Sequence, residues 1–420
     1  MRFDWSDPSV RSAALARPRG RDDSALRAAV SAIIDDVGKR GWPALVEQAV
    51  RIDGRAPGPI EVAPFAGEAR RSMPVEAQEA MRLAARNIEA FHRATLPRDT
   101  EVTTFPGLRV AKQWRPLDSA GLYVPGGKAP LFSTLLMLAI PARVAGVREL
   151  VVVTPPRPDG GLDPAIALAA ELAGIETIWD VGGAQAIAAL AFGAGDIPAV
   201  DRICGPGNAW VSAAKSLVSS RPGGPGIDLP AGPSELLVIA DESANPATVA
   251  ADLLSQAEHD RDAQVLLVSP SSGLIDAVEA AVERQSAVIG GGFAPARFIL
   301  CADLVEAITI ANAYAPEHLS LACDGAAAMV NAIRNAGAIF VGHHAAESFG
   351  DYLAGSSHVL PTDGAARFTG GVSTLTFIKA ITVQQVTAEA AAALSAPAAT
   401  LARLEGLEAH ARAAEARVAA

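Results

Sequence analysis

Short apolar runs that end in glycine or proline turns dominate the chain after residue 114. The runs are ELVVVTPP, ETIWDVGG, VDRICGPGN, ELLVIADE, QVLLVS, RFILCAD and AIFVG. Runs of this length, bounded by turn residues, are typical of strands that are buried on both faces of a parallel sheet. Alanine-rich stretches at 163–173 and 184–192 lie between the runs and are long enough for crossover helices. The pattern therefore predicts an α/β fold with two doubly wound layers.

The rest of the chain divides around these strands. Residues 24–98 contain Ala, Leu, Arg and Glu in a mixed periodicity with few β-branched runs, which favours helices. The segment 219–235 concentrates glycine and proline and separates the strands into two halves. From residue 397 on, interleaved acidic and basic residues predict a terminal helix, and such a helix often docks on a neighbouring subunit.

We therefore expect four parts. A helical N-terminal region at 1–110 packs on the second α/β domain, two α/β domains occupy 111–233 and 234–370, and a helical tail forms 371–420.

The amino-acid composition argues against two classes of binding partner and suggests a cellular compartment. The chain has 46 acidic and 35 basic residues and a net charge of -11, which disfavours nucleic acid and anionic membrane surfaces. Three widely spaced cysteines do not suggest a disulfide framework or a thiolate zinc site, so a cytoplasmic protein is the expectation. The start, MRFDWSDPSV, does not resemble a signal peptide, and the apolar stretch at 131–147 is interrupted by Pro141 and Arg143, so no membrane span is expected.

Two histidine segments are candidates for chemistry. In SQAEHD, Gln256 and His259 are three residues apart, so a helix here would place both on one face, where they could share a metal; a charged surface helix is the alternative. In AYAPEHL, Glu317 and His318 come directly before an apolar run that predicts a strand. An adjacent carboxylate and imidazole offer two proton acceptors of different basicity, although a solvated loop pair would look the same.

A third segment, GDYLAGSSHV, is rich in turn residues. Its Asp351 could be an oxygen ligand and His358 an imidazole behind it, or the two could belong to a simple turn and a surface histidine. His343 and His344 are adjacent, so in an extended segment they point to opposite faces, and we expect both to be exposed bystanders. No G-x-G-x-x-G or Walker motif is present, but the turns DVGGAQA and CGPGNAW could present helix amides to a pyrophosphate, or be ordinary βα turns.

Taken together, seven motifs resemble the histidinol dehydrogenase family, in the same order along the chain. They are GLYVPGGKAPLFST, DVGGAQAIAALAFG, DRICGPGNAWV, DLPAGPSELLV, LLSQAEHD, AYAPEHL and GDYLAGSSHVLPT, and they span about residues 110–365. The C-terminal Glu405 and His410 extend the resemblance to the end of the chain.

The resemblance implies a homodimer of two incomplete Rossmann-like domains with helical terminal parts, with one zinc ion per subunit and NAD as the cofactor. Carried over residue by residue, the implied zinc ligands are Gln256, His259, Asp351 and His410, the last from the other subunit through an exchanged tail. The substrate, L-histidinol, would meet these ligands together with Ser234, His318 and Glu405, and NAD would meet Tyr123, Gln185 and Asn208.

The resemblance also implies the chemistry. His318 would remove the alcohol proton during hydride transfer, and Glu317 would help to activate water on the way from the aldehyde to the acid. Three alternatives stay open on the sequence: a related dehydrogenase of another small polar alcohol, a zinc hydrolase that uses Glu317, and a zinc-stabilised binding protein.

Overall fold

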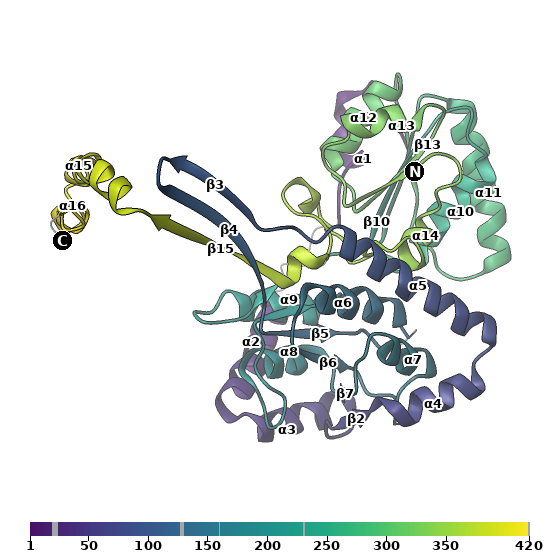
Figure 1. The fold of residues 1–420 in the computed structure, drawn as a ribbon. Coiled ribbons are helices and arrows are strands. Elements are labelled where there is room, and N and C mark those ends of the chain that lie inside the picture. Colours follow the sequence, from purple (N-terminus) through teal and green to yellow (C-terminus); the bar gives the residue numbers. More distant parts are fainter. Residues whose placement is uncertain (19–23, 127–129, 159, 230–231, 419–420) are drawn as a thin grey trace.

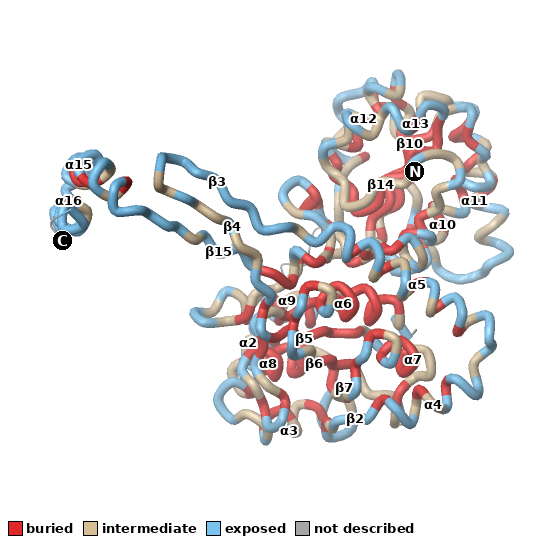
Figure 2. The backbone as a smooth tube through the Cα atoms, in the orientation of Figure 1, coloured by how far each residue is buried: buried red, intermediate tan, exposed pale blue. Residues whose placement is uncertain are grey.

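The structure is a computed structural model of the 420-residue chain and describes residues 1–18, 24–126, 130–158, 160–229 and 232–418. Two α/β units lie next to each other, and an arm that ends in two helices projects from them (Figure 1). The expected fold class, α/β with two Rossmann-like doubly wound units, is confirmed. Burial is concentrated in the two units, whereas the arm is exposed or half-buried apart from a few buried residues in its terminal helices (Figure 2).

The first unit is built on a six-stranded sheet. In spatial order the strands are β2 (Pro59–Glu61), β7 (Thr177–Asp180), β6 (Glu149–Thr154), β5 (Ser119–Tyr123), β8 (Arg202–Cys204) and β9 (Gly226–Ile227). All neighbours are parallel except β2, which pairs antiparallel with β7. The strand order reverses between β5 and β8, and ligands of doubly wound sheets bind beside such a reversal, at the carboxyl ends of the strands.

Helices cover both faces of this sheet. One face carries α4 (Val62–Ser72), α5 (Val75–Ala94), α6 (Phe132–Ala145) and α7 (Pro164–Leu172), and the other carries α2 (Ser24–Arg40), α3 (Trp42–Asp53), α8 (Gly183–Phe192) and α9 (Ala209–Ser219). Because both faces are covered, the central strands are apolar on both sides, which is the pattern that identified them in the sequence.

The second unit has a six-stranded, wholly parallel sheet. Its spatial order is β1 (Arg2–Asp4), β12 (Arg297–Leu300), β11 (Gln264–Ser269), β10 (Glu235–Ala240), β13 (His318–Ala322) and β14 (Ala338–Val341). Helices α10 (Pro246–Ala257) and α11 (Ser272–Ile289) cover one face, and α1 (Arg11–Ala14), α12 (Leu304–Tyr314) and α13 (Ala326–Met329) cover the other. The remaining short helices are α14 (Glu347–Tyr352), η1 (Pro8–Val10), η2 (Val330–Ala332), η3 (Ala365–Arg367) and η4 (Thr374–Phe377).

The N-terminal region differs from the expectation. Helices α2 to α5 pack mainly on the first unit, because their apolar faces join the two cores on either side of the first sheet, and α5 also contacts the second unit through Asn87 and Leu353. Residues 1–17 belong to the second unit, where β1 forms the edge strand beside β12, α1 covers one face and Arg17 binds Glu235. The region 1–110 is also not wholly helical, since it contains β3 (Thr100–Phe105) and the start of β4 (Leu108–Pro116).

The arm is a three-stranded antiparallel sheet in the order β15-β4-β3. Strand β15 (Ile378–Val386) pairs with the whole of β4, from Ile378 opposite Pro116 to Val386 opposite Leu108. Helices α15 (Ala388–Leu404) and α16 (Glu408–Glu415) follow at its tip (Figure 1). The tail at 371–420 is therefore not helical throughout, because residues Ile378–Val386 form a strand of the arm.

Among the described residues, no helix is both long enough and apolar enough to cross a bilayer. The three cysteines, Cys204, Cys301 and Cys323, are buried and free.

Candidate active site

The three residues expected to meet NAD lie at the carboxyl edge of the first sheet. Tyr123 is the last residue of β5, Gln185 is in the first turn of the helix after β7, and Asn208 is the N-cap of the helix after β8. The Tyr123 hydroxyl accepts a hydrogen bond from the Gly183 amide (3.2 Å), so two of the three neighbouring loops are in contact.

The loop after β8 is held close to β5 by an unusual backbone. Gly205 has a φ of 127°, and a Cβ at this position would lie 2.1 Å from the Tyr123 carbonyl oxygen. The buried side chains of Lys215 and Asp228 form an ion pair on the other side, and they bind the Gly205 carbonyl (2.8 Å) and amide (2.7 Å), respectively. The glycine is therefore required for the close approach of this loop to β5.

Glu317 and His318 lie at the start of β13 in the second unit and are almost completely buried. The His318 Nδ1 atom lies 3.1 Å from the Glu235 carbonyl oxygen, 3.4 Å from Glu347 Oε1 and 3.6 Å from Glu317 Oε2. Its Nε2 atom lies 3.7 Å from Asp351 Oδ1. The segment is thus a buried acid–imidazole group and not the solvated loop pair that the sequence also allowed.

Burial and mutual charge set the protonation of this group. Burial raises the pKa of Glu317 to about 7, an effect that His318 partly opposes, and burial raises the pKa of Glu347 to about 8. Burial lowers the pKa of His318, but the surrounding carboxylates outweigh it and raise that pKa to about 10. Near neutral pH these pKa values place protons on both His318 and the Glu347 carboxyl group, and a cation bound among the carboxylates would lower the pKa of the imidazole and free it.

The implied metal ligands are only partly brought together within one chain. Gln256 is buried on the last turn of α10; with its amide nitrogen turned toward Glu347, its oxygen accepts a hydrogen bond from the Glu235 amide (3.0 Å). Burial would raise the pKa of Asp351, but His318 outweighs it and lowers that pKa, with smaller contributions from His358 and His259. Helix α10 ends at Ala257, so the expectation that Gln256 and His259 share a helical face is wrong.

The two C-terminal candidates lie elsewhere. Glu405 follows α15 and His410 is on α16, both exposed, at the far end of the arm (Figure 1). Within the part of the chain that the structure describes, no group of three or more His, Cys, Asp or Glu side chains is placed to hold a metal ion.

The other candidates have varied surroundings. Ser234 lies directly before β10, and its carbonyl accepts a hydrogen bond from the Gln264 amide (2.8 Å). His358 is half-buried beside Asp351, with Nδ1 3.2 Å from the Asp351 carbonyl oxygen. His344 is exposed, as expected, and His343 is half-buried beside Asp324 and Ser243.

The two units meet beside Asp351. The amino end of α6, which follows β5 out of the first sheet, contacts this segment: Thr134 Oγ1 lies 3.0 Å from His358 Nε2, and the Phe132 ring stacks on Tyr352 with centroids 6.4 Å apart. From α5, the Asn87 side-chain amide donates to the Leu353 carbonyl (2.8 Å). The expected cofactor edge of the first unit is therefore adjacent to the buried acid–imidazole group of the second.

Sequence reasoning missed three residues of this group: Arg17, Glu235 and Glu347. Glu235 and Glu347 are fully buried, and Arg17 forms an ion pair with Glu235. An acidic residue at the start of the apolar run ELLVIA was the available signal for Glu235, because a charge at that position of a central strand requires a partner.

Fold and site together define an α/β enzyme with two Rossmann-like units and a polar site at their junction. Comparison with known proteins identifies its family. The family model described as histidinol dehydrogenase matches residues 16–418.

Individual relatives agree over the whole length. The chain is 47% identical over 421 residues to the histidinol dehydrogenase of Xanthomonas euvesicatoria pv. vesicatoria, covering 98% of this chain and 97% of the relative. It is 44% identical over 428 residues to that of Salmonella typhimurium, covering 99% and 97%. The crystal structure of histidinol dehydrogenase from Elizabethkingia anophelis matches with a TM-score of 0.93 at 37% identity, covering 100% of this chain and 98% of that one. The chain belongs to the histidinol dehydrogenase family, and it is accordingly an oxidoreductase that acts on histidinol.

Proposed function

We propose that the enzyme oxidises L-histidinol to L-histidine in two successive NAD-dependent steps, through an aldehyde that stays bound, as a cytoplasmic homodimer with one zinc ion per subunit. The observation that carries this proposal is the contact at the unit junction, where the amino end of α6, which follows β5 and Tyr123, packs on Tyr352 and His358 beside Asp351, and Asp351 faces buried His318. On this proposal residues 111–233 bind the cofactor and residues 234–370 bind the substrate.

The proton-transfer roles follow from the geometry of the imidazole. Because Nδ1 faces the Glu235 carbonyl at 3.1 Å, it carries the hydrogen, and the lone pair of a neutral ring is on Nε2. Nε2 is buried without a hydrogen-bond partner among the described residues, and this is the atom that would take the alcohol proton. NAD, held by Tyr123, Gln185 and Asn208, would supply the hydride acceptor for each oxidation.

Glu317 would act in the second half. Its raised pKa, about 7, suits a carboxyl group that must accept a proton from water near neutral pH. Water added to the aldehyde gives a hydrate with a hydroxyl group, so His318 can again take the proton in the second oxidation.

The residues near Asp351 fit a zinc ion that also binds substrate. Gln256, His259 and Asp351 offer amide, imidazole and carboxylate donors without a thiolate, and His410 would complete the set. When bound, the ion would chiefly orient the imidazole and amine of histidinol. Chelation is expected to abolish turnover while leaving most of the helical circular dichroism, because each unit has its own core. Unfolding on chelation would show a structural ion instead.

Glu405 and His410 would act in the other subunit. In their own chain they lie at the tip of the arm, far from α14 with Asp351 (Figure 1), on a helix pair whose Leu401 (65% exposed) and Leu404 (80% exposed) are left uncovered by the described residues. A second copy supplies the missing surface, and exchange of the arm would bring His410 to the partner's site.

A mixture experiment tests the shared site. His318→Ala and His410→Ala homodimers should both be inactive, whereas co-refolded heterodimers contain one site with an intact body and an intact tail. Return of part of the activity supports sharing. If heterodimers form and stay inactive, each tail serves its own chain.

Histidinol with NAD tests the function itself. We expect two NADH per histidinol consumed and histidine as product. His318→Asn should lower turnover by roughly 100- to 10,000-fold with zinc retained, the usual size of a general-base contribution. Glu317→Gln should slow oxidation of the aldehyde more than oxidation of the alcohol. NADH formed only with another alcohol would point to a related dehydrogenase, and no NADH at all would favour a hydrolase or a binding protein.

A further inference from the structure

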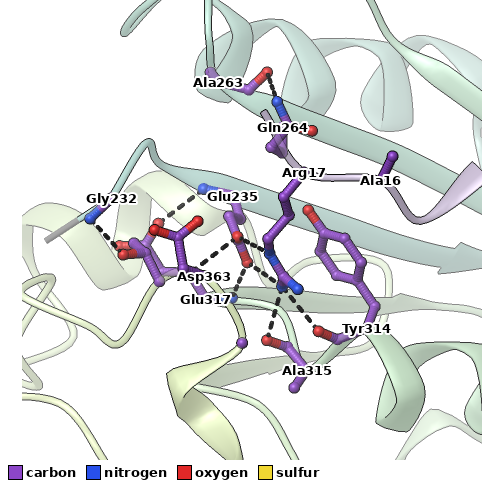
Figure 3. Close-up of polar contacts among 12 residues, drawn as sticks. Ala16, Arg17, Gly232, Glu235, Ala263, Gln264, Tyr314, Ala315, Glu317 and Asp363 are labelled. Carbon is purple, nitrogen blue, oxygen red and sulfur yellow. Dashed lines mark hydrogen bonds and ion pairs between the residues drawn. The ribbon is translucent and has the colours of Figure 1, made fainter. Parts of the chain in front are cut away.

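A charged cluster lies directly behind Glu317 and His318, on the side away from Asp351. Its centre is Glu235, the first residue of β10, whose side chain has no exposed surface. Arg17, from the segment after α1, binds both Glu235 carboxylate oxygens, with Nη2 2.9 Å from Oε2 (Figure 3). A planar guanidinium that binds both oxygens of a carboxylate fixes its orientation as well as its charge.

Arg17 also holds the turn that leads to the catalytic pair. Its Nη2 donates to the carbonyls of Tyr314 (2.8 Å) and Ala315 (3.3 Å), and its guanidinium lies over the Tyr314 ring, 3.9 Å from the centroid. Ala315 has a φ of 56°, which is uncommon for a residue with a side chain, and Glu317 follows two positions later. One guanidinium therefore fixes the entry of both β10 and β13 (Figure 3).

Glu235 in turn contacts both catalytic candidates. Its amide donates to Glu317 Oε2 (2.8 Å), and its carbonyl accepts from His318 Nδ1 (3.1 Å). Its carboxylate accepts from the amides of Glu317 (3.4 Å) and Asp363 (3.1 Å). The main chain of one residue thus orients the carboxyl group of Glu317 and fixes which nitrogen of His318 carries the hydrogen.

We propose that Arg17 and Glu235 form a positioning clamp that holds the Glu317 carboxylate and the His318 imidazole in their reactive orientations. The proposal rests on the proposed function, since it assigns these two groups to proton transfer. Neither Arg17 nor the Glu235 side chain touches the reacting atoms, so both act through the groups that they hold. A buried ion pair is costly to desolvate, which makes it a poor general stabiliser and a good device for a single, rigid geometry.

Arg17→Lys is the informative substitution. Lysine keeps the charge but cannot bind both carboxylate oxygens and two carbonyls with a planar fork. We expect kcat for histidinol oxidation to fall by roughly 10- to 100-fold, the effect of a displacement near 1 Å, with KM and bound zinc within about threefold of the parent. Arg2→Lys is the matched control, because Arg2 lies on the same N-terminal segment and also binds a glutamate, Glu279, but at the surface. It should leave kcat unchanged.

Combination with His318→Asn separates positioning from general damage. If Arg17 acts through the imidazole, Arg17→Lys should cost little more in the His318→Asn background, because the group that it positions is already gone. Tyr314→Leu, which removes the ring under the guanidinium and no charge, should give the same pattern with a smaller loss.

The outcomes are distinct. If Arg17→Lys and Tyr314→Leu both fold and keep the full parental kcat, the clamp is refuted. It is also refuted if Arg17→Lys lowers kcat by the same factor in the parent and in the His318→Asn background. Failure of both variants to fold would also overturn it, since the cluster would then serve folding alone. Unchanged turnover in His318→Asn itself would instead refute the proposed role of the base and leave the enzyme's assignment to be revised.

Discussion

His92 should make the first unit sensitive to acid. It is the last member of the buried stripe of α5, has no exposed surface, and neither ring nitrogen has a hydrogen-bond partner among the described residues. Burial lowers its pKa from 6.5 to about 4. The folded state therefore binds this proton more weakly than the unfolded chain does. Stability from His92 is complete above pH 6.5 and is lost progressively as the pH falls toward 4.

The size of the effect follows from the two pKa values. At pH 5 the unfolded histidine is almost fully protonated and the folded one is mostly neutral, which costs about 2 kcal/mol of unfolding free energy by linkage. In His92→Leu this cost disappears, and replacing unpaired ring nitrogens by an apolar group is neutral or stabilising at pH 7.5. For a unit of this size the drop in Tm between pH 7.5 and pH 5 should shrink by roughly 4–8 °C.

Calorimetry at the two pH values measures this directly, and His344→Leu, at an exposed histidine, is the matched control. The control should keep the full parental drop in Tm. An equal pH dependence in the parent and His92→Leu would refute the reasoning, because it would mean that His92 is protonated, or hydrogen-bonded, in the folded state.

Three further results are expected. Lys215→Met leaves the buried carboxylate of Asp228 without its ion-pair partner, so it should lower the free energy of unfolding by about 3–5 kcal/mol. Because the loop after β8 is then released, the KM for NAD should also rise. An unchanged melting curve would contradict this. Gly205→Ala should prevent stable folding or abolish NAD binding, because the new methyl group would meet a fixed backbone carbonyl at 2.1 Å, and normal NAD titration would show that the loop can move. His259→Ala should reduce bound zinc in a metal assay, whereas His343→Ala should not, and zinc loss in the second variant would show that His343 is more than a bystander.

Much of the fold could be predicted from the sequence because the central strands are covered by helices on both faces. The apolar runs around Val152, Leu237 and Leu266 could form little else, and each is a parallel strand. Strand β15 was missed for the opposite reason: the segment at Ile378 is exposed along nearly its whole length, so it lacks the alternation that marks a half-buried strand.

The site was less accessible to sequence reasoning. Glu317 and His318 stood out because they are adjacent, whereas the contact of Arg17 with Glu235 joins residues 218 positions apart, a separation that no local pattern records. The expected helical face shared by Gln256 and His259 failed because helix α10 ends between them, and helix ends are the least predictable feature of a single sequence.

The pairing of β15 with β4 also determines when the arm can be completed during synthesis of the chain. Strand β4 ends at Pro116, and its partner begins only at Ile378, so the edge of the β3–β4 hairpin stays open until the ribosome has added more than half of the chain. At typical elongation rates this interval is on the order of tens of seconds. An open antiparallel edge can pair with another chain in that time. The arm is therefore where nascent copies of this enzyme are most exposed to premature association, and truncation before residue 378 should yield aggregates and not a shortened, soluble protein.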